Sequence, residues 1–366
     1  MIKGVDLSSI IEIEKHGGKY YLDNKETDIL DIMKYYDINL IRLRLFNDPY
    51  DEDGNSYGCG KCDLDNLIEI VKRINKVGID WYLDFHYSDA WADPGKQIMP
   101  KAWKNINYEE LVAALYEYTK YVLIKLKELN YDPKIISIGN EITSGMCWPI
   151  GHIDNRENLI GLINSGIKAV KEIMPSSKIM LHLDNGGNNE LYRDFFDKYF
   201  DMGGLDFDYI GLSYYPLWHG SLQSLKNNLD DLANRYNKDL LIVETSFPFS
   251  KEDYKEYERL DDDQRKGMAS KKELLDKLDI EVSKDGQIIY MDKLINIINS
   301  INNNRCKGFV YWGGESIPVK GVYWATYEGI KYMNEKGPLG NEWANQALFD
   351  YDGNSLPVLN FIKNIK

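Results

Sequence analysis

The feature that most constrains the fold of this chain is a regular alternation of short apolar segments with longer amphipathic ones. Apolar segments of strand length occur at about 3–8, 39–45, 79–85, 135–140, 178–183, 207–213, 239–243 and 307–312. Between them, apolar residues recur every three or four positions, most clearly at 64–77, 108–129, 157–173, 221–234 and 287–304. This order predicts parallel strands that are connected by crossover helices.

Eight strand–helix units favour a closed α/β barrel over a doubly wound open sheet. No Pro-, Gly- or Ser-rich linker divides the 366 residues, so we expect residues 1–366 to form a single (β/α)8 TIM barrel domain. Such barrels place their functional residues at the carboxyl ends of the strands. Long connections there predict a substrate cleft, and the chain has them at 46–63, 86–107, 244–286 and 313–355.

The charge balance excludes some classes of partner. Lys and Arg total 44 and Asp and Glu total 58, which gives a formal net charge of −14. Nucleic acid binding depends on Lys and Arg that neutralise phosphates, and no basic stripe is present, so we expect neither a nucleic acid partner nor an anionic membrane surface.

The start of the chain bears on localisation. No segment has the roughly 18 apolar residues of a membrane span, and residues 1–6 carry no apolar stretch suited to a signal peptide. As written, the chain is predicted to be cytoplasmic, and it would be secreted only if a leader had been removed. Four cysteines are too few for a disulfide framework and slightly favour a reducing compartment.

Aromatic residues are unusually frequent, with 27 Tyr and 8 Trp in a total of 13%. Flat rings with a polar edge suit ligands that alternate C–H faces with hydroxyl groups, such as sugars. Most of these rings still belong in the core. Trp91, Trp218 and Trp312 are candidates to stack on a sugar ring, with core packing as an equal alternative.

Nearly every predicted strand is followed by polar or aromatic side chains. In chain order these are Asp6, Arg42, Arg44, His86, Asp89, Trp91, Asn140, Glu141, His182, Asp184, Tyr214, Tyr215, Glu244, Tyr311 and Trp312. A barrel with a purely structural rim does not need so many ionisable groups, because each must be solvated, paired or used.

Glu141 and Glu244 stand out because each directly follows an apolar strand. An ion pair at the barrel rim is the alternative for either residue alone. Together, two facing carboxyls can cleave a glycosidic bond: one protonates the leaving oxygen while the other attacks the anomeric carbon. A separation of about 5–5.5 Å predicts retention of configuration and about 6.5–9.5 Å predicts inversion. Asn140 can bind the sugar 2-hydroxyl. Arg42 or Arg44, if placed beside Glu244, would keep the Glu244 carboxylate ionised.

Several segments carry a family resemblance, in order and over residues 4 to about 356. They are RLRLFNDPYDEDGNSYG (42–58), LDFHYSDAWADPGKQ (83–97), IGNEITSGMCWPIG (138–151), LSYYPLWHGSL (212–222), VETSFP (243–248) and NEWANQALFDYDGN (341–354). The chain resembles the endo-β-1,4-galactanases of glycoside hydrolase family 53, which belongs to clan A. The resemblance implies a retaining (β/α)8 hydrolase with Glu141 as acid/base and Glu244 as nucleophile.

Further roles follow from the same resemblance. It implies that Arg44 supports the nucleophile, that Asn140 binds the 2-hydroxyl, and that the sugar cleft is lined by His86, Asp89, Trp91, Asp184, Tyr214, His219 and Trp312. The implied substrate is β-1,4-galactan of type I arabinogalactan, a pectin side chain, or its galacto-oligosaccharides. The alternatives are another clan A activity, such as a β-mannanase, xylanase or exo-β-galactosidase, and a non-catalytic carbohydrate-binding barrel.

Some segments depart from the family pattern or suggest metals. Residues 311–324 read YWGGESIPVKGVYW where many members have a YWEP-like string. The charged segment 250–280 lies where some members hold calcium, but it shows no clear ligand set, and 51–55 and 350–354 are better explained as turns. A site built from Cys59, Cys62 and Cys147 has little support, since no second C-x-x-C accompanies the first. We therefore expect no metal site and no required cofactor, leave a structural calcium open, and expect a monomer.

Overall fold

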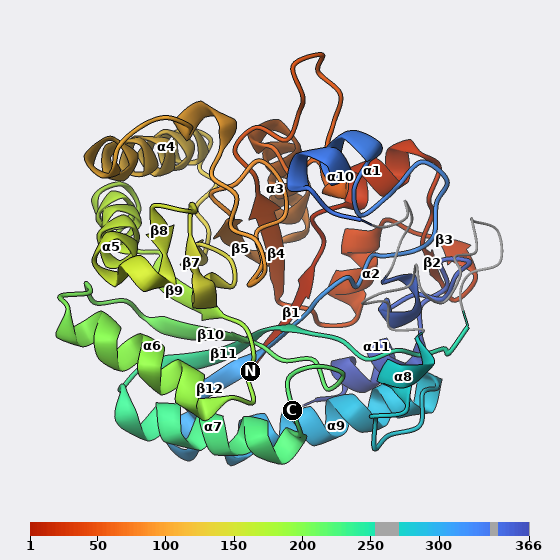
Figure 1. Cartoon of the computed structure of the whole chain (residues 1–366). Coiled ribbons are helices and arrows are strands. Elements are labelled where there is room, and N and C mark those ends of the chain that lie inside the picture. The colour runs from red at the N-terminus through yellow and green to blue at the C-terminus, as the bar shows by residue number, and fades with distance from the viewer. Residues whose placement is uncertain (253–270, 337–342, 366) are drawn as a thin grey trace.

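The computed structural model describes residues 1–252, 271–336 and 343–365, and confirms the predicted barrel (Figure 1). Eight parallel strands close in the order β1-β12-β11-β10-β9-β6-β5-β4, with β1 paired to β4. They are β1 (Ile2–Asp6), β4 (Leu40–Leu45), β5 (Asp80–Phe85), β6 (Ile135–Ile138), β9 (Lys178–Leu183), β10 (Tyr209–Ser213), β11 (Asp239–Thr245) and β12 (Cys306–Tyr311). Each lies within a few residues of a predicted strand.

Helices cover the outside of the barrel (Figure 1). The five clearest predictions correspond to α3 (Leu64–Val77), α4 (Tyr108–Glu128), α5 (Arg156–Ile173), α7 (Leu222–Arg235) and α9 (Lys284–Ser300). The other helices are α1 (Ile10–Lys15), α2 (Ile29–Tyr35), α6 (Asn189–Asp201), α8 (Lys272–Leu275), α10 (Tyr327–Met333) and α11 (Pro357–Lys363). Within the described ranges, none of the helices has the length and apolar character needed to cross a bilayer.

Several short strands and turns lie outside the eight barrel strands and the helices. Two small antiparallel sheets pair β2 (Tyr21–Leu22) with β3 (Lys25–Glu26) and β7 (Gly145–Met146) with β8 (Gly151–His152). Single 3-10 turns are η1 (Cys59–Lys61), η2 (Lys101–Trp103), η3 (Ile142–Ser144), η4 (Ile153–Asn155), η5 (Asn302–Asn304) and η6 (Ala344–Gln346).

Local signals in the sequence explain the sharp helix boundaries. Asn107 and Glu110 form a capping box at the start of α4, in which each side chain accepts from the other's backbone N–H. Asp63 caps α3 by accepting from the Asn66 N–H, and the helix ends at Gly78, which has φ 69°. These ends agree with the predicted boundaries because caps depend on neighbouring residues alone.

Side chains alternate between the two faces of the barrel strands. Outward residues pack against the helices in a continuous core. Inward residues form a second apolar cluster of Leu40, Tyr82, Ile135, Met180, Leu241, Val243 and Val310. Two residues further along three of these strands, the inward positions become polar, at Arg42, Asp84 and Ser137. The barrel interior therefore has an apolar floor beneath a polar layer.

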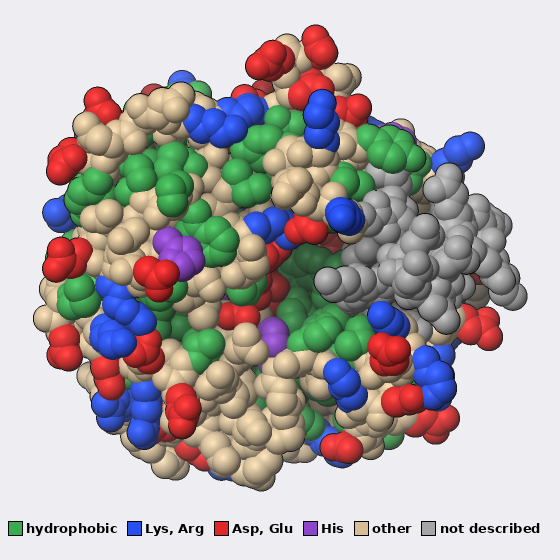
Figure 2. Space-filling view, in the orientation of Figure 1, with side chains coloured by type: hydrophobic (Ala, Val, Ile, Leu, Met, Phe, Trp, Pro, Cys, Tyr) green, Lys and Arg blue, Asp and Glu red, His purple; other side chains and the backbone are tan. Residues whose placement is uncertain are grey.

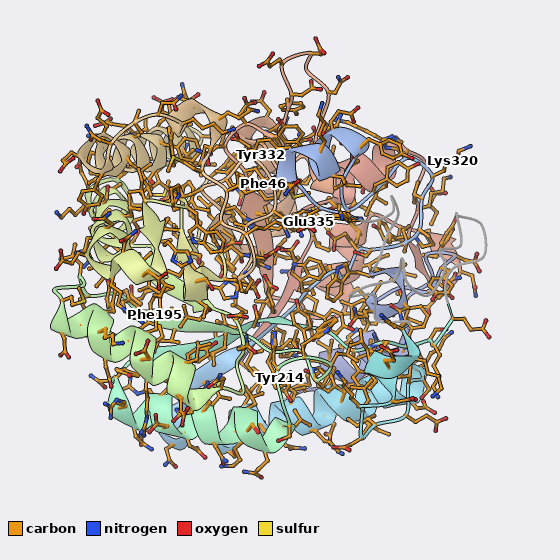
Figure 3. The ribbon with its side chains drawn as sticks, in the orientation of Figure 1. Phe46, Phe195, Tyr214, Lys320, Tyr332 and Glu335 are labelled. Carbon is orange, nitrogen blue, oxygen red and sulfur yellow. The ribbon has the colours of Figure 1, made fainter. Side chains whose placement is uncertain are left out.

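The long connection after β12 lies along one side of the barrel mouth. The segment after β12 carries α10 to the 46–63 connection, where Tyr332 stacks on Tyr57 with 4.5 Å between ring centroids. Figure 3 labels Tyr332 and Glu335 on this segment. Glu335 Oε1 lies 3.2 Å from Lys96 Nζ, which belongs to the connection after β5. These contacts build a wall on that side of the carboxyl-end face.

The acidic turns expected at 51–55 and 350–354 are confirmed as turns. Asp51 Oδ1 accepts from the Asn55 N–H at 2.8 Å, and Asp350 Oδ1 accepts from the Asn354 N–H at 2.9 Å. Each aspartate thus uses its side chain to close its own turn. Most of the charged segment 250–280, where the calcium option was left open, lies outside the described residues, which omit 253–270.

Candidate active site

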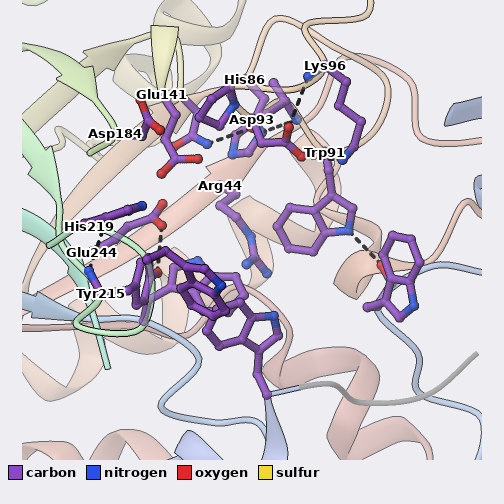
Figure 4. A pocket seen from close by; sticks show the side chains of 17 residues that line it. Arg44, His86, Trp91, Asp93, Lys96, Glu141, Asp184, Tyr215, His219 and Glu244 are labelled. Atoms are coloured by element: carbon purple, nitrogen blue, oxygen red, sulfur yellow. Dashed lines mark hydrogen bonds and ion pairs between the residues drawn. The ribbon is translucent and has the colours of Figure 1, made fainter. Parts of the chain in front are cut away.

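A pocket of about 460 Å³ opens at the carboxyl ends of the barrel strands. Figure 2 shows this hollow near the centre of the face, with acidic side chains at one side and hydrophobic ones at its base. Its lining, drawn in Figure 4, consists of Arg44, His86, Trp91, Ala92, Asp93, Pro94, Lys96, Asn140, Glu141, Asp184, Tyr215, Trp218, His219, Glu244, Trp312, Trp324 and Trp343.

Glu141 is presented to the pocket by an unusual backbone turn after β6. Gly139 has φ 85°, and a Cβ there would lie 2.4 Å from a methyl carbon of Ile142. Glu141 itself is left-handed at φ 46° and ψ 50°, a conformation that costs a residue with a Cβ about 1–2 kcal/mol. Gln97 Nε2 donates to the Glu141 carbonyl at 3.3 Å, and the Glu141 N–H donates to His182 Nδ1 at 3.4 Å. The barrel thus holds this residue in a strained position.

Glu244 lies in β11 and is held by two partners. Arg42 Nη1 is 2.7 Å from Glu244 Oε1, and the Tyr215 hydroxyl donates to Glu244 Oε2 at 2.9 Å. The Arg42 side chain is fully buried and also pairs with Asp84 at 2.7 Å and with Asp6 at 3.3 Å. One guanidinium therefore fixes three carboxylates at the floor of the pocket.

The expected role of Arg44 at the nucleophile needs correction, because Arg42 makes that contact. Arg44 lies two residues further along β4, and its Nη2 donates to Ser9 Oγ at 3.0 Å. Its guanidinium carbon lies 4.4 Å from the ring centroid of Trp91. Arg44 still lines the pocket, but as a wall residue.

The two glutamates face each other closely. One carboxylate oxygen from Glu141, one from Glu244 and a ring nitrogen of His182 all lie within 4.8 Å of one another. This separation is on the short side of the two glycosidase geometries, the side that belongs to direct attack on the sugar.

Burial raises the pKa of both carboxyls, but by different amounts. For Glu141, the negative charges of Glu244 and Asp184 add to the effect of burial, and its pKa lies well above the ordinary value. For Glu244, Arg42 and the Tyr215 hydrogen bond offset part of that rise. A single proton shared by the pair therefore resides on Glu141.

A second charged layer supports the pair. Burial alone would raise the pKa of Asp84, but Arg42 and His86 hold that pKa well below its usual range. His86 Nε2 lies 3.2 Å from Asp84 Oδ2, while its Nδ1 accepts from the Ala92 N–H at 3.2 Å. Burial lowers the pKa of His86, so the ring is neutral and its Nε2 carries the hydrogen.

Comparison with known protein families identifies the family of this chain. A sequence model of glycosyl hydrolase family 53 matches residues 2–362. The chain belongs to this family. Family 53 membership makes the chain a glycoside hydrolase and confirms the resemblance found in the sequence motifs.

Relatives of this family 53 chain match along most of its length. The endo-beta-1,4-galactanase of Bacillus subtilis (strain 168) is 35% identical over 377 residues, which cover 98% of this chain and 84% of the relative. The arabinogalactan endo-beta-1,4-galactanase of Thermothelomyces thermophilus is 32% identical and covered over 99% of both chains. The structure of the Ignisphaera aggregans GH53 catalytic domain is 38% identical, with a TM-score of 0.90 over 99% of this chain and 95% of that one.

Most residues that the resemblance implied do line the pocket of this family 53 enzyme. They are Glu141, Glu244, Arg44, His86, Trp91, Asn140, Asp184, His219 and Trp312. Trp218, a candidate stacking ring, lines it too. Burial lowers the pKa of His219 to about 4, so this ring is neutral; its Nδ1 lies 3.2 Å from the Tyr215 nitrogen and 3.1 Å from the Ser213 carbonyl oxygen.

Tyr214 was expected in the cleft but lies outside it. It follows Leu212 on the outward face of the strand, its side chain is fully buried, and its hydroxyl donates to the Gly220 carbonyl at 2.8 Å (Figure 3). The inward position belongs to the next residue, Tyr215, which bonds to Glu244. Strand alternation thus reverses the roles of two adjacent tyrosines.

Asp89 was also expected in the cleft and is instead a structural group. It is 1% exposed and accepts from the N–H groups of Asp48 at 3.0 Å and Lys101 at 2.7 Å. The Tyr332 hydroxyl donates to it at 3.1 Å. Hydrogen bonds to Asp89 therefore link the connections after β4, β5 and β12 behind the pocket wall.

The pocket also contains residues that the sequence reasoning had not singled out. Trp324 and Trp343 come from the long connection after β12, and Asp93 and Lys96, which pair with each other, come from the connection after β5. The Trp91 Nε1–H donates to the Trp324 carbonyl at 2.7 Å, which joins these two connections (Figure 4). Their only sequence signal was a tryptophan or a charge within a long connection.

The cysteines give no support to a thiolate metal site. Cys62 and Cys147 are both buried, and their sulfurs donate to different carbonyls, of Ser8 and Tyr87. Burial raises the pKa of Cys62 to about 12, which disfavours the thiolate that a metal requires. The Cys59 side chain is outside the described part of the chain.

Proposed function

We propose that this family 53 enzyme hydrolyses β-1,4-galactosidic bonds within galactan or its oligosaccharides, with retention of configuration. The observation that carries the proposal is the close pair of Glu141 and Glu244, whose environments separate their proton affinities. The substrate class in this proposal is taken from relatives that are named endo-beta-1,4-galactanases.

In this mechanism the ionised Glu244 attacks the anomeric carbon while Glu141 protonates the leaving oxygen. The products of this step are a glycosyl ester on Glu244 and a shortened galactan chain. Glu141, now a carboxylate, then takes a proton from water as that water attacks the anomeric carbon. Hydrolysis of the ester releases the sugar and restores both carboxyls.

Asn140 is the proposed ligand of the 2-hydroxyl. Its Oδ1 accepts from Arg42 Nη2 at 2.8 Å, and its Nδ2 donates to the Ala92 carbonyl at 2.8 Å. These bonds fix which way the amide points. An amide nitrogen carries two hydrogens, so the second one is left for a sugar hydroxyl whose contact strengthens in the transition state.

The rest of the pocket suits a neutral sugar chain. Trp91, Trp312 and Trp343 offer flat faces, and His86 and Asp184 offer polar atoms at the edges. The reaction needs two carboxyls and water, and therefore no cofactor. We further propose that residues 1–366 act as one catalytic domain and as a monomer.

The test is incubation of the purified enzyme with debranched galactan, mannan and xylan, with products resolved by size over time. Short galacto-oligosaccharides formed early from galactan alone are the expected result. Early release of galactose would instead indicate an exo-acting enzyme. Products from mannan or xylan would indicate another specificity. Sugar binding without any product would indicate a non-catalytic barrel. The anomeric form of the first product, followed by NMR, tests retention.

Removing the Tyr215 hydroxyl tests its action on the nucleophile. Tyr215→Phe is expected to lower kcat about 10- to 100-fold, the worth of a hydrogen bond to a charged group. Because that bond lowers the pKa of Glu244, its loss raises this pKa and moves the acidic limb of the pH–rate profile to higher pH. The adjacent Tyr214→Phe is the control and should behave as wild type. Equal profiles for the two variants would contradict the assignment.

A further inference from the structure

Glu315, in the turn after β12, is a buried carboxyl that the mechanism above does not use. Its side chain is 2% exposed, and within the described part of the chain its Oε2 has no hydrogen-bond partner. The turn itself is rigid, because the Tyr20 hydroxyl donates to the Glu315 carbonyl at 2.7 Å and the Leu348 N–H donates to the Gly314 carbonyl at 3.0 Å. Glu315 is therefore held in place beside the barrel mouth.

Ser9, which precedes α1, links this carboxyl to the pocket. The Ser9 N–H donates to Glu315 Oε1 at 3.2 Å, and Ser9 Oγ accepts from Arg44 Nη2 at 3.0 Å. Gly60 packs so tightly on Ser9 that a Cβ there would lie 2.7 Å from the serine oxygen. The serine hydroxyl makes no capping bond to α1, so its bond to Arg44 is separate from the helix start.

Arg44 is the pocket residue at the end of this chain of contacts. Its guanidinium carbon lies 4.4 Å from the ring centroid of Trp91 and 5.8 Å from that of Trp312. The two rings are 6.1 Å apart and inclined at 57°. The cation therefore lies within cation–π distance of two indoles that line the sugar pocket.

The charges around Glu315 indicate its working form. Asp6 of β1, Arg44 of β4 and the Tyr20 hydroxyl are the titratable groups that face it. Burial and the negative charge of Asp6 raise the pKa of Glu315 to about 8, although Arg44 opposes the rise. The carboxyl is therefore neutral at neutral pH and accepts from Ser9 without adding a charge beside Arg44.

We propose that Glu315 is a positioning residue for sugar binding: through Ser9 it holds the Arg44 guanidinium between the indole rings of Trp91 and Trp312. The inference rests on the proposed function, because those rings are taken to be the sugar platform. It explains how the altered string at 311–324 takes part in the site, although Glu315 does not line the pocket.

Three variants test the proposal: two remove a contact and one is conservative. Glu315→Ala removes the acceptor of the Ser9 N–H, and Ser9→Ala removes the hydroxyl that accepts from Arg44. Each variant should raise KM for galactan about fivefold, the scale of one lost hydrogen bond, with kcat within about twofold. Glu315→Gln keeps the acceptor for the Ser9 N–H without charge and should restore the wild-type KM. The indole fluorescence and near-UV circular dichroism should change in Glu315→Ala and recover in Glu315→Gln.

The pH dependence adds a readout that a purely structural role would not move. Above about pH 8 the wild-type Glu315 ionises and attracts the Arg44 guanidinium away from the rings, so KM should rise. Glu315→Gln should show no such rise. An equal rise in both proteins would overturn the proposal.

The remaining outcomes are separable. If Glu315→Ala does not fold, Ser9→Ala decides, and an unchanged KM and unchanged indole spectrum in it would refute the inference. The spectra need no turnover, so they test the positioning of Arg44 even if the wild-type enzyme proves inactive on galactan. Inactivity with the expected spectral changes would thus remove the proposed substrate and leave the contact intact.

Discussion

Replacing Glu244 by Ala is expected to lower kcat on galactan by about 10⁴-fold or more, the scale seen when an enzyme loses its covalent nucleophile. The fold should survive, because Arg42 keeps Asp84 and Asp6 as partners when Glu244 is removed. Circular dichroism and a sugar-binding titration check this, and rates on galactan measure the loss. Near-normal turnover in a correctly folded variant would show that another group attacks the sugar.

Added azide makes the Glu244→Ala test sharper. The small anion fits where the carboxylate was and can attack the anomeric carbon while Glu141 still protonates the leaving group. The expected product is a galactosyl azide of inverted configuration. Azide that restored activity with retained configuration would point instead to loss of the acid/base.

Glu141→Ala is expected to lower kcat on galactan about 10²- to 10⁴-fold, the contribution of a general acid and base. With a dinitrophenyl galactoside the first step should be nearly unaffected, because that leaving group departs without a proton. The glycosyl-enzyme should then accumulate, and a burst of dinitrophenol measures it. A loss of equal size on both substrates would argue against the acid role of Glu141.

The pH profile provides a second measure of Glu141. The acid must be protonated, so activity should fall as pH rises through its pKa, which burial and the charge of Glu244 hold well above the ordinary value. The variant should lack this alkaline limb on the dinitrophenyl substrate. Persistence of the same limb would assign it to another group, such as Glu315 with its pKa of about 8.

Much of the fold could be predicted because its signals are local. The apolar alternation located all eight barrel strands, and the caps at Asp63 and Asn107 located two helix starts. Glu141 and Glu244 were recognisable for a similar reason, since Glu141 lies three residues after the end of β6 and Glu244 is the penultimate residue of β11, two buried strands whose carboxyl ends face the mouth.

The incorrect assignments depended on geometry between strands. Counting alternate residues from Leu212 would have put Tyr214 outward and Tyr215 inward, although a register shift between Leu212 and Ser213 complicates the count. Arg42 and Arg44 share one face of β4, so alternation cannot separate them. Their depths in the barrel depend on how neighbouring strands are staggered, which a single sequence does not encode locally.

The rest of the site depended on contacts between distant connections. Asp89 has a structural role because the chain returns at Lys101 and Tyr332 to bind it. Trp324 reaches the pocket only because α10 crosses to the 46–63 connection. The pairings with Tyr332 and Trp324 join residues more than 200 positions apart in the numbering, and no local pattern predicts them.

In the proposed mechanism, the closeness of the two glutamates also determines when Glu141 loses and regains its proton. When Glu244 becomes an ester it loses its negative charge, and with it one of the causes that raise the pKa of Glu141. Glu141 has just given up its proton, and the negative charge that would favour its reprotonation is now absent. Glu141 can remain a carboxylate until water arrives, and ester hydrolysis restores the charge that makes it an acid again.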